Sequence, residues 1–159
     1  MPVPDFVLEL RRHVGTAPLW LSGVSAVVVD PDGRILLGRR TDTGRWAVVS
    51  GILDPGEQPA VAAVREVAEE TGIHAEVESL VSVHSGEEIT YPNGDRASYL
   101  DLTFLCRYRS GQARVGDDES LEVGWFRPDG LPEDLQETSR QRIADALGYD
   151  PAVGPRFIR

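Results

Sequence analysis

Three glutamates stand close together in one short stretch of the chain, and side chains of this type could bind a metal ion. Glu66, Glu69 and Glu70 lie within residues 59–72, a segment that predicts a helix because Pro59 suits a first helical position and Gly72 a left-handed stop. At about 3.6 residues per turn, the three carboxylates gather on one side. Carboxylates one turn apart could share or bracket divalent cations such as Mg²⁺, which prefers oxygen ligands.

The position of these glutamates is unfavourable for an ordinary solvated helix face. They lie in the last turns, beside the negative end of the helix dipole, where an acid typically costs about 0.3–1 kcal/mol. Glu66 and Glu70 also form a like-charged pair four residues apart, which costs roughly 0.2–0.5 kcal/mol. A solvated acidic face is the alternative, but local rules broken together indicate a functional site. Bound metal ions would neutralise substrate phosphates and orient a water for in-line attack on phosphorus.

The apolar residues of the same helix predict which side is buried. They gather roughly opposite the glutamates and are Val61, Val64, Val67 and Ala68. We therefore expect the helix to bury that side and to present its three carboxylates together on the other.

The residues around the glutamates resemble the signature of the Nudix (MutT-like) hydrolase family. Gly51 and Glu57, followed after seven residues by the run 65–73 (REVAEETGI), match the full Nudix box. All nine specified positions across 23 residues agree, including the apolar positions Val67 and Ile73. The resemblance implies an α/β fold, with α/β/α layers around a central mixed β-sheet, and an enzyme that hydrolyses acid anhydrides.

Segments outside the box extend the resemblance over most of the chain. Residues 36–40 look like the strand that precedes the box, and residues 44–46 look like its lead-in. Residues 118–119, followed by Trp125-Phe126, are similar to the later acidic segment and strand of the family. The N-terminal helix and the last ten residues lie outside the part that can be matched.

The resemblance implies a set of metal ligands. They would be the catalytic carboxylates Glu66, Glu69 and Glu70 and the backbone carbonyl of Ser50, and Glu66 or a partner would help to activate water. Glu119 would be a further carboxylate ligand. Its acidic neighbours leave that assignment open, and they are Asp117, Asp118 and Glu122.

Other residues of the box would act without touching the metal. Arg65 and Glu57 would form an internal pair that holds the loop against the helix. Outside the box, Arg40 is a candidate phosphate contact. Gly51 is retained, and we expect its flexibility to serve a tight turn from strand to loop.

The chain departs from the family pattern just before the box. Where the family commonly reads Pro-Gly-Gly, this sequence has Val49-Ser50-Gly51. Because Ser50 would act through its backbone carbonyl, the loss of a glycine there need not abolish metal binding.

The elements that must position these residues alternate between helix and strand. Helices are predicted at residues 5–14, 59–71 and 139–147. Strands are predicted at residues 20–29, 34–40, 46–49, 75–83, 97–108 and 121–126, with a hairpin turn at 30–33 and a turn at 91–95. We expect one domain over residues 1–159, with 1–15 as an N-terminal helical extension and 149–159 as an irregular tail.

Composition excludes several classes of protein. No stretch approaches the roughly 18 unbroken apolar residues of a membrane helix, so we expect a cytoplasmic protein without a membrane partner. The net charge is −10 and all sixteen basic residues are arginine, which disfavours binding to polymeric nucleic acid and excludes lysine chemistry. The single cysteine, Cys106, is expected to be a buried and unreactive thiol.

The function that we expect is Mg²⁺-dependent hydrolysis of a pyrophosphate bond in a nucleoside-diphosphate-linked small molecule. The substrate could be a (d)NTP, an oxidised one included, ADP-ribose or a nucleotide sugar, and Mn²⁺ should substitute for Mg²⁺. A sensor that binds such a ligand without cutting it would be expected to lose the acidic box, which is intact here. An isomerase on the same fold would need a positioned cysteine and an apolar pocket. A homodimer, with the N-terminal helix as a candidate contact, stays open.

Overall fold

The computed structural model describes residues 3–157. The three predicted helices are confirmed, although the last begins two residues earlier than expected. In chain order the elements are α1 (Asp5–Val14), β1 (Leu19–Val29), β2 (Ile35–Arg40), β3 (Trp46–Ala47), β4 (Val49–Ile52), α2 (Pro59–Thr71), β5 (Ile73–Ser85), β6 (Ile89–Thr90), β7 (Arg96–Gly111), β8 (Ser120–Phe126), the 3₁₀ turn η1 (Pro128–Gly130), α3 (Glu137–Leu147) and β9 (Arg156–Phe157).

The strands form one mixed sheet around two long parallel neighbours. Its main path runs β3-β2-β1-β7-β5-β9, while β4 pairs with β1, β6 with β7 and β8 with β2. Strands β1 and β7 are parallel from the pair Leu19–Ala97 to the pair Val29–Arg107, and β5 is antiparallel to β7. The predicted central mixed sheet is therefore confirmed.

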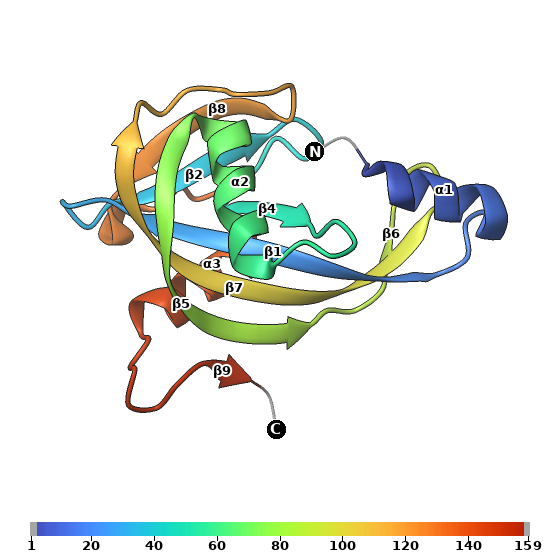
Figure 1. Cartoon of the computed structure of the whole chain (residues 1–159). Helices are drawn as coiled ribbons and strands as arrows, with labels where there is room; N and C mark the ends of the chain where they lie inside the picture. Colours follow the sequence, from blue (N-terminus) through green and yellow to red (C-terminus); the bar gives the residue numbers. More distant parts are fainter. Residues whose placement is uncertain (1–2, 158–159) are drawn as a thin grey trace.

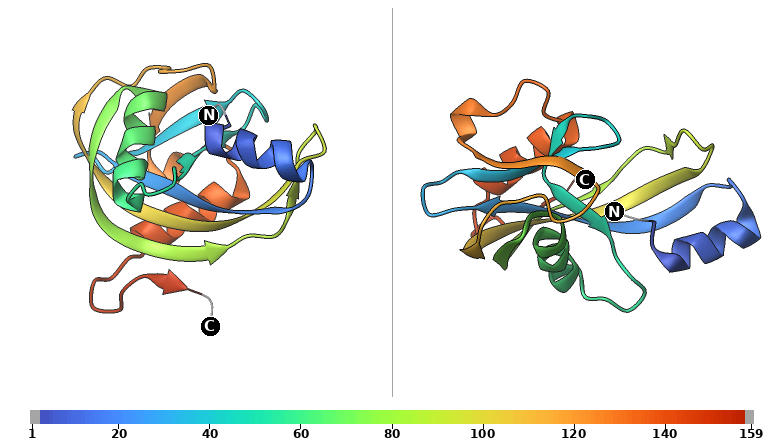
Figure 2. Two further views of the ribbon diagram at one scale, coloured as in Figure 1. Left: turned by 45° about the vertical axis from the view of Figure 1, so that its right-hand side comes forward. Right: turned by 90° about the horizontal axis from the view of Figure 1, so that it is seen from above.

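Helices α2 and α3 cover opposite faces of this sheet (Figure 2). Side chains of a strand alternate between the two faces, so one strand can supply both cores. The even-numbered residues of β1 from 24 to 28 pack in the cluster that contains Val67 of α2, whereas Val27 and Val29 pack in the cluster that contains Ile143 of α3. Burial on both faces explains why this strand reads as a continuous apolar run.

Helix α1 lies at the far end of β1 and β7, beside β6 (Figure 1). Its Val7 packs with Leu21 of β1 and Ala97 of β7. The Arg11 guanidinium donates hydrogen bonds to the carbonyls of Ala17 and Arg96, at 2.6 and 2.7 Å. In the part of the chain that the structure describes, no helix has the length and apolar character needed to cross a membrane.

The expected irregular tail contains a short strand. Strand β9 pairs in parallel with β5, with Arg156 opposite Ser82 and Phe157 opposite Val83. Strand β9 therefore covers the outer edge of β5 at these two residues, where unpaired backbone groups could otherwise accept another strand. Residues 158–159 of the predicted tail lie outside the described residues.

Candidate active site

Helix α2 packs on the sheet with two of its glutamates facing inward, which differs from the sequence expectation. Val61, expected in the core, is 57% exposed. At about 100° per residue, Glu66 and Glu70 lie in the middle of the buried arc. The small side chains of Ala62 and Ala63 allow a close approach of this arc to the sheet. The buried residues of α2 are Ala62, Ala63, Glu66, Val67, Glu70 and Thr71.

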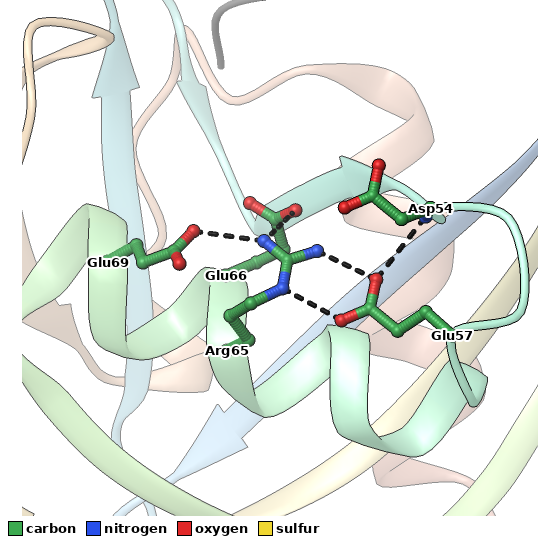
Figure 3. Close-up of polar contacts among 5 residues, drawn as sticks. All are labelled: Asp54, Glu57, Arg65, Glu66 and Glu69. Atoms are coloured by element: carbon green, nitrogen blue, oxygen red, sulfur yellow. Dashed lines mark hydrogen bonds and ion pairs between the residues drawn. The ribbon is translucent and has the colours of Figure 1, made fainter. Parts of the chain in front are cut away.

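Arg65 joins the helix to the loop that precedes it (Figure 3). Its Nε and Nη2 donate to the two carboxylate oxygens of Glu57 at 2.8 and 2.9 Å, a forked geometry that is strong for a charged pair. Its Nη1 donates to Glu66 Oε1 and Glu69 Oε2, both at 2.9 Å. The hydrogen bond with Arg65 holds the pKa of Glu57 below its ordinary value, and Glu57 in return raises the pKa of Arg65. One guanidinium thus orients three carboxylates.

Glu66 and Glu70 are both buried, with 2% and 7% of their surface exposed. Burial raises the pKa of Glu66 to about 7, although the neighbouring Arg65 opposes the change. Burial and then the charge of Glu66 raise the pKa of Glu70 to about 8. Among the described residues, no donor reaches Oε1 of Glu70, which is buried without a hydrogen-bond partner. A buried, unpartnered carboxylate oxygen is costly, so this pair is arranged for something other than stability.

A hard divalent cation fits these two carboxylates. Mg²⁺ takes carboxylate oxygens as ligands and usually keeps several waters, so it needs few protein ligands. Its charge would compensate the two buried carboxylates and give Oε1 of Glu70 the partner that it lacks.

The third glutamate lies apart from this pair. Glu69 is at the surface, with 56% of its side chain exposed, and its carboxylate is turned toward Arg65. Within residues 3–157, no group of three or more His, Cys, Asp or Glu side chains is arranged to hold a metal ion. The expectation that the three carboxylates lie on the unburied side of α2 is therefore wrong for Glu66 and Glu70, which face inward, and holds for Glu69.

Arg40 lies at the end of β2 with its guanidinium engaged by an acid. Its Nε and Nη2 donate to both oxygens of Asp42, at 2.9 and 2.8 Å. The hydrogen bond with Asp42 raises the pKa of Arg40, and the charge of Glu70 adds to the effect. Arg40 is thus within electrostatic range of the buried pair. Asp42 was not among the residues predicted for the site, although an acid two residues after an arginine in a turn can indicate an ion pair between the two.

Strand β4, which contains Ser50 and Gly51, lies beside α2 (Figure 1). Ser50 stands opposite Ser25 of β1, and Gly51 stands opposite Val24. The expectation of a tight turn at Gly51 is wrong, because this residue continues the strand and is not among the glycines with positive φ. Gly72 does adopt the left-handed conformation, with φ of 67°, and ends α2.

The acidic residues just before β8 lie near Arg40 and Glu70, although they are distant from both in the sequence. The carbonyl of Glu119 accepts hydrogen bonds from the backbone N–H and the hydroxyl of Thr41, at 2.8 and 3.0 Å, next to Arg40. Asp117 accepts a hydrogen bond from the Glu119 N–H at 3.0 Å, and its charge contributes to raising the pKa of Glu70. Asp118 and Glu122 are exposed.

Two other features do not belong to this site. The Cys106 thiol is fully buried and burial raises its pKa to about 12, which agrees with an unreactive thiol. A cavity of about 280 Å³ lies between the β1–β2 turn and the start of the β7–β8 connection, with Tyr108 and Trp125 in its wall. Its carboxylate, Asp30, already accepts hydrogen bonds from Arg34 and from two backbone N–H groups.

Comparison with known proteins gives consistent results at the level of the family. A family model described as the NUDIX domain matches residues 20–146. A MutT-like protein of Streptomyces ambofaciens is 39% identical over 143 residues, which cover 89% of this chain and 87% of the relative. An ADP-ribose pyrophosphatase of Methanocaldococcus jannaschii is 32% identical over 129 residues, covering 77% of this chain and 73% of the relative. A putative 8-oxo-dGTP diphosphatase of Bacillus subtilis is 29% identical over 127 residues, covering 80% of each.

Solved structures share the arrangement of helices and strands. A MutT NUDIX hydrolase from Burkholderia pseudomallei superposes with a TM-score of 0.67 at 32% identity, covering 80% of this chain and 98% of that one. A UDP-X diphosphatase superposes with a TM-score of 0.65 at 26% identity, covering 90% of this chain and 68% of that one. Three of these relatives are named for different substrates, but each of the three names states a diphosphatase or pyrophosphatase activity.

Proposed function

Because this chain belongs to the Nudix family and is a MutT-like hydrolase, we propose that it cleaves a pyrophosphate bond in a nucleoside-diphosphate-linked small molecule with the help of Mg²⁺. The observation that carries this proposal is the buried pair of Glu66 and Glu70, with Oε1 of Glu70 lacking a hydrogen-bond donor. A protein that used this helix only for packing would gain stability from a neutral side chain at either position.

The chain's own residues would divide the work as follows. Glu66 and Glu70 would hold the metal, with the carbonyl of Ser50 and the side chain of Glu119 as further ligands. The bound cation would supply neutralisation of phosphate charge and a water of lowered pKa. Arg65 would keep the carboxylate of Glu66 in place, because its Nη1 is hydrogen-bonded to Oε1 of that residue.

The geometry favours a changed role for Glu69 and supports the expected role of Arg40. Glu69 is solvent-exposed and bonded to Arg65, which supports a contribution through a water or a second ion rather than through the buried pair. Arg40 would exchange its partner Asp42 for a substrate phosphate. A phosphate offers the guanidinium a pair of oxygens similar to the pair that Asp42 offers.

The relatives support a class of substrate. The names 8-oxo-dGTP diphosphatase, ADP-ribose pyrophosphatase and UDP-X diphosphatase share a nucleoside attached to a diphosphate. We therefore propose this shared unit as the part recognised here. The group beyond the scissile bond could be a phosphate or a sugar.

The test is a substrate panel combined with conservative variants. Purified protein would be assayed against dNTPs, 8-oxo-dGTP, ADP-ribose and nucleotide sugars with Mg²⁺, with Mn²⁺ and with excess EDTA. We expect turnover of at least one compound only when metal is present. Glu66→Gln and Glu70→Gln should each lower kcat on the order of 10²-fold, while Glu122→Gln, at an exposed residue of β8, should not. Full turnover in EDTA, or undiminished kcat in both buried variants, would contradict the proposal.

A further inference from the structure

The connection between β7 and β8 is fastened to the end of the acidic helix. We call residues 112–119 the docked loop. Its Arg114 N–H donates to the carbonyl of Thr71 at 3.0 Å, and its Gly116 N–H donates to the carbonyl of Glu70 at 2.9 Å. The last carbonyls of a helix have no partner within it, so the docked loop satisfies two groups that would otherwise need water.

Gly116 touches the helix backbone so closely that no side chain fits there. A Cβ at this position would lie 1.9 Å from the carbonyl oxygen of Glu69 and 2.9 Å from the carbonyl carbon of Glu70. Both are backbone atoms of a helix and cannot rotate away as a side chain could. The φ of Gly116 is not in the left-handed region, so this glycine is required by space and not by backbone conformation.

The same loop brings positive charge to an end of the helix that lacks it. Helix α2 has no basic residue in its last turn. The Arg114 side chain packs across Gly72, with its Nε 2.9 Å from the position that a Cβ of Gly72 would occupy. A cation beside the last turn of a helix is favourable, typically by about 0.3–1 kcal/mol, which helps to hold the docked loop in place.

Docking fixes where Asp117 and Glu119 lie. Asp117 comes directly after Gly116 and accepts a hydrogen bond from the Glu119 N–H at 3.0 Å. The carbonyl of Glu119 is then tied to Thr41 at the end of β2. The loop is therefore held by α2 through Arg114 and Gly116 and by the end of β2 through Glu119, with Asp117 between these two anchors.

We propose that Gly116 is a positioning residue of the metal site: its missing side chain lets the docked loop lie flat on α2, so that Asp117 and Glu119 are held beside Glu70. This inference rests on the proposed function. It has independent support from Oε1 of Glu70, which is buried without a hydrogen-bond partner on the side of α2 that faces inward. Lifting the loop by one methyl group would move both acids and weaken the affinity for a divalent ion.

The test compares two glycine-to-alanine changes by a binding measurement that needs no substrate. Gly116→Ala is the test variant. Gly130→Ala is the matched control, because Gly130 also has φ outside the left-handed region and a Cβ there would meet no atom within 4 Å. Isothermal titration of each folded protein with Mn²⁺ should give an affinity at least tenfold weaker for Gly116→Ala and unchanged for Gly130→Ala. The Mg²⁺ concentration for half-maximal turnover should rise in parallel, with kcat recovering at saturating Mg²⁺.

A purely structural role would give a different result. It would lower the melting temperature of Gly116→Ala but leave Mn²⁺ affinity as in the wild type, and that outcome overturns the inference. If Gly116→Ala does not fold, Asp117→Asn decides the matter. Asparagine keeps the Oδ1 that accepts the Glu119 N–H but removes the charge beside Glu70. Mn²⁺ binding three- to tenfold weaker supports the inference, and unchanged binding overturns it.

The outcomes separate this inference from the proposed function. If Mn²⁺ binding weakens in the variants but the wild type turns over no compound of the panel, only the hydrolase assignment is contradicted. A wild type that binds no Mn²⁺ overturns the inference directly.

Discussion

Replacing Glu70 by glutamine should stabilise the metal-free protein at alkaline pH. In the folded state the pKa of Glu70 is raised to about 8 by burial and by the charge of Glu66, against an ordinary value of 4.5. The folded protein therefore favours the neutral carboxyl. Stability from this group is fully present below pH 4.5 and is lost as the pH rises through 8.

The size of the effect follows from the same two values. The difference between 4.5 and about 8 corresponds to roughly 5 kcal/mol of unfolding free energy, at 1.36 kcal/mol for each tenfold change in proton affinity. Glutamine removes the charge but leaves an amide N–H in the place where no partner reaches Oε1, which costs about 1–3 kcal/mol. We therefore expect Glu70→Gln to be more stable than the wild type by roughly 2–4 kcal/mol at pH 9 and about equal or slightly less stable at pH 5.

Urea denaturation in EDTA at pH 5 and pH 9 would measure this difference. Glu122→Gln is the control, because it removes the charge of one exposed glutamate in β8 and should leave the pH dependence unchanged. Added Mn²⁺ at pH 9 should stabilise the wild type and have little effect on Glu70→Gln. If the metal-free wild type and Glu70→Gln lose the same stability between pH 5 and 9, the reasoning from buried charge is refuted.

Four further substitutions test other contacts of the site. Arg65→Lys should lower the unfolding free energy by about 1–2 kcal/mol in urea denaturation, since an ammonium cannot reproduce the fork that binds Glu57, and equal stability would count against that contact. Asp42→Ala should lower the substrate KM about three- to tenfold in steady-state assays by releasing Arg40, whereas Arg40→Ala should raise it. Unchanged KM in both would remove Arg40 from the phosphate site. Gly72→Ala should cost at least about 1–2 kcal/mol in thermal unfolding, because φ is 67° and the new Cβ meets Arg114; a melting temperature equal to that of the wild type would contradict this.

The local features of the acidic helix were predictable from the sequence. Its bounds depend on Pro59 and Gly72, whose backbone preferences act over a few residues, and the structure has the helix at Pro59–Thr71 as expected. The nine positions of the box likewise lie within 23 residues, so their spacing alone identifies the family. The long apolar run at residues 20–29 predicted a strand, and the structure shows that this strand, β1, contributes to the cores on both faces of the sheet.

The side of the helix that is buried could not be read from its apolar pattern. Hydrophobic periodicity assumes that carboxylates face water, but Glu66 and Glu70 are buried while Val61 is exposed. The assumption fails at a functional site, because a bound cation can compensate buried carboxylates that are unfavourable in the metal-free protein.

The sequence by itself determined which short segments carry the chemistry, because the helix ends and the spacing of the box depend on neighbours within a few residues. Only the tertiary structure decided which acids meet. Asp42 holds Arg40, and the docked loop carries Asp117 to a helix some fifty residues earlier in the chain and joins Glu119 to Thr41 at the end of β2. Such contacts depend on close packing of backbone segments that are distant in the sequence, as where Gly116 lies against the backbone of Glu69. The spacing of residues along the chain does not show which distant segments pack together.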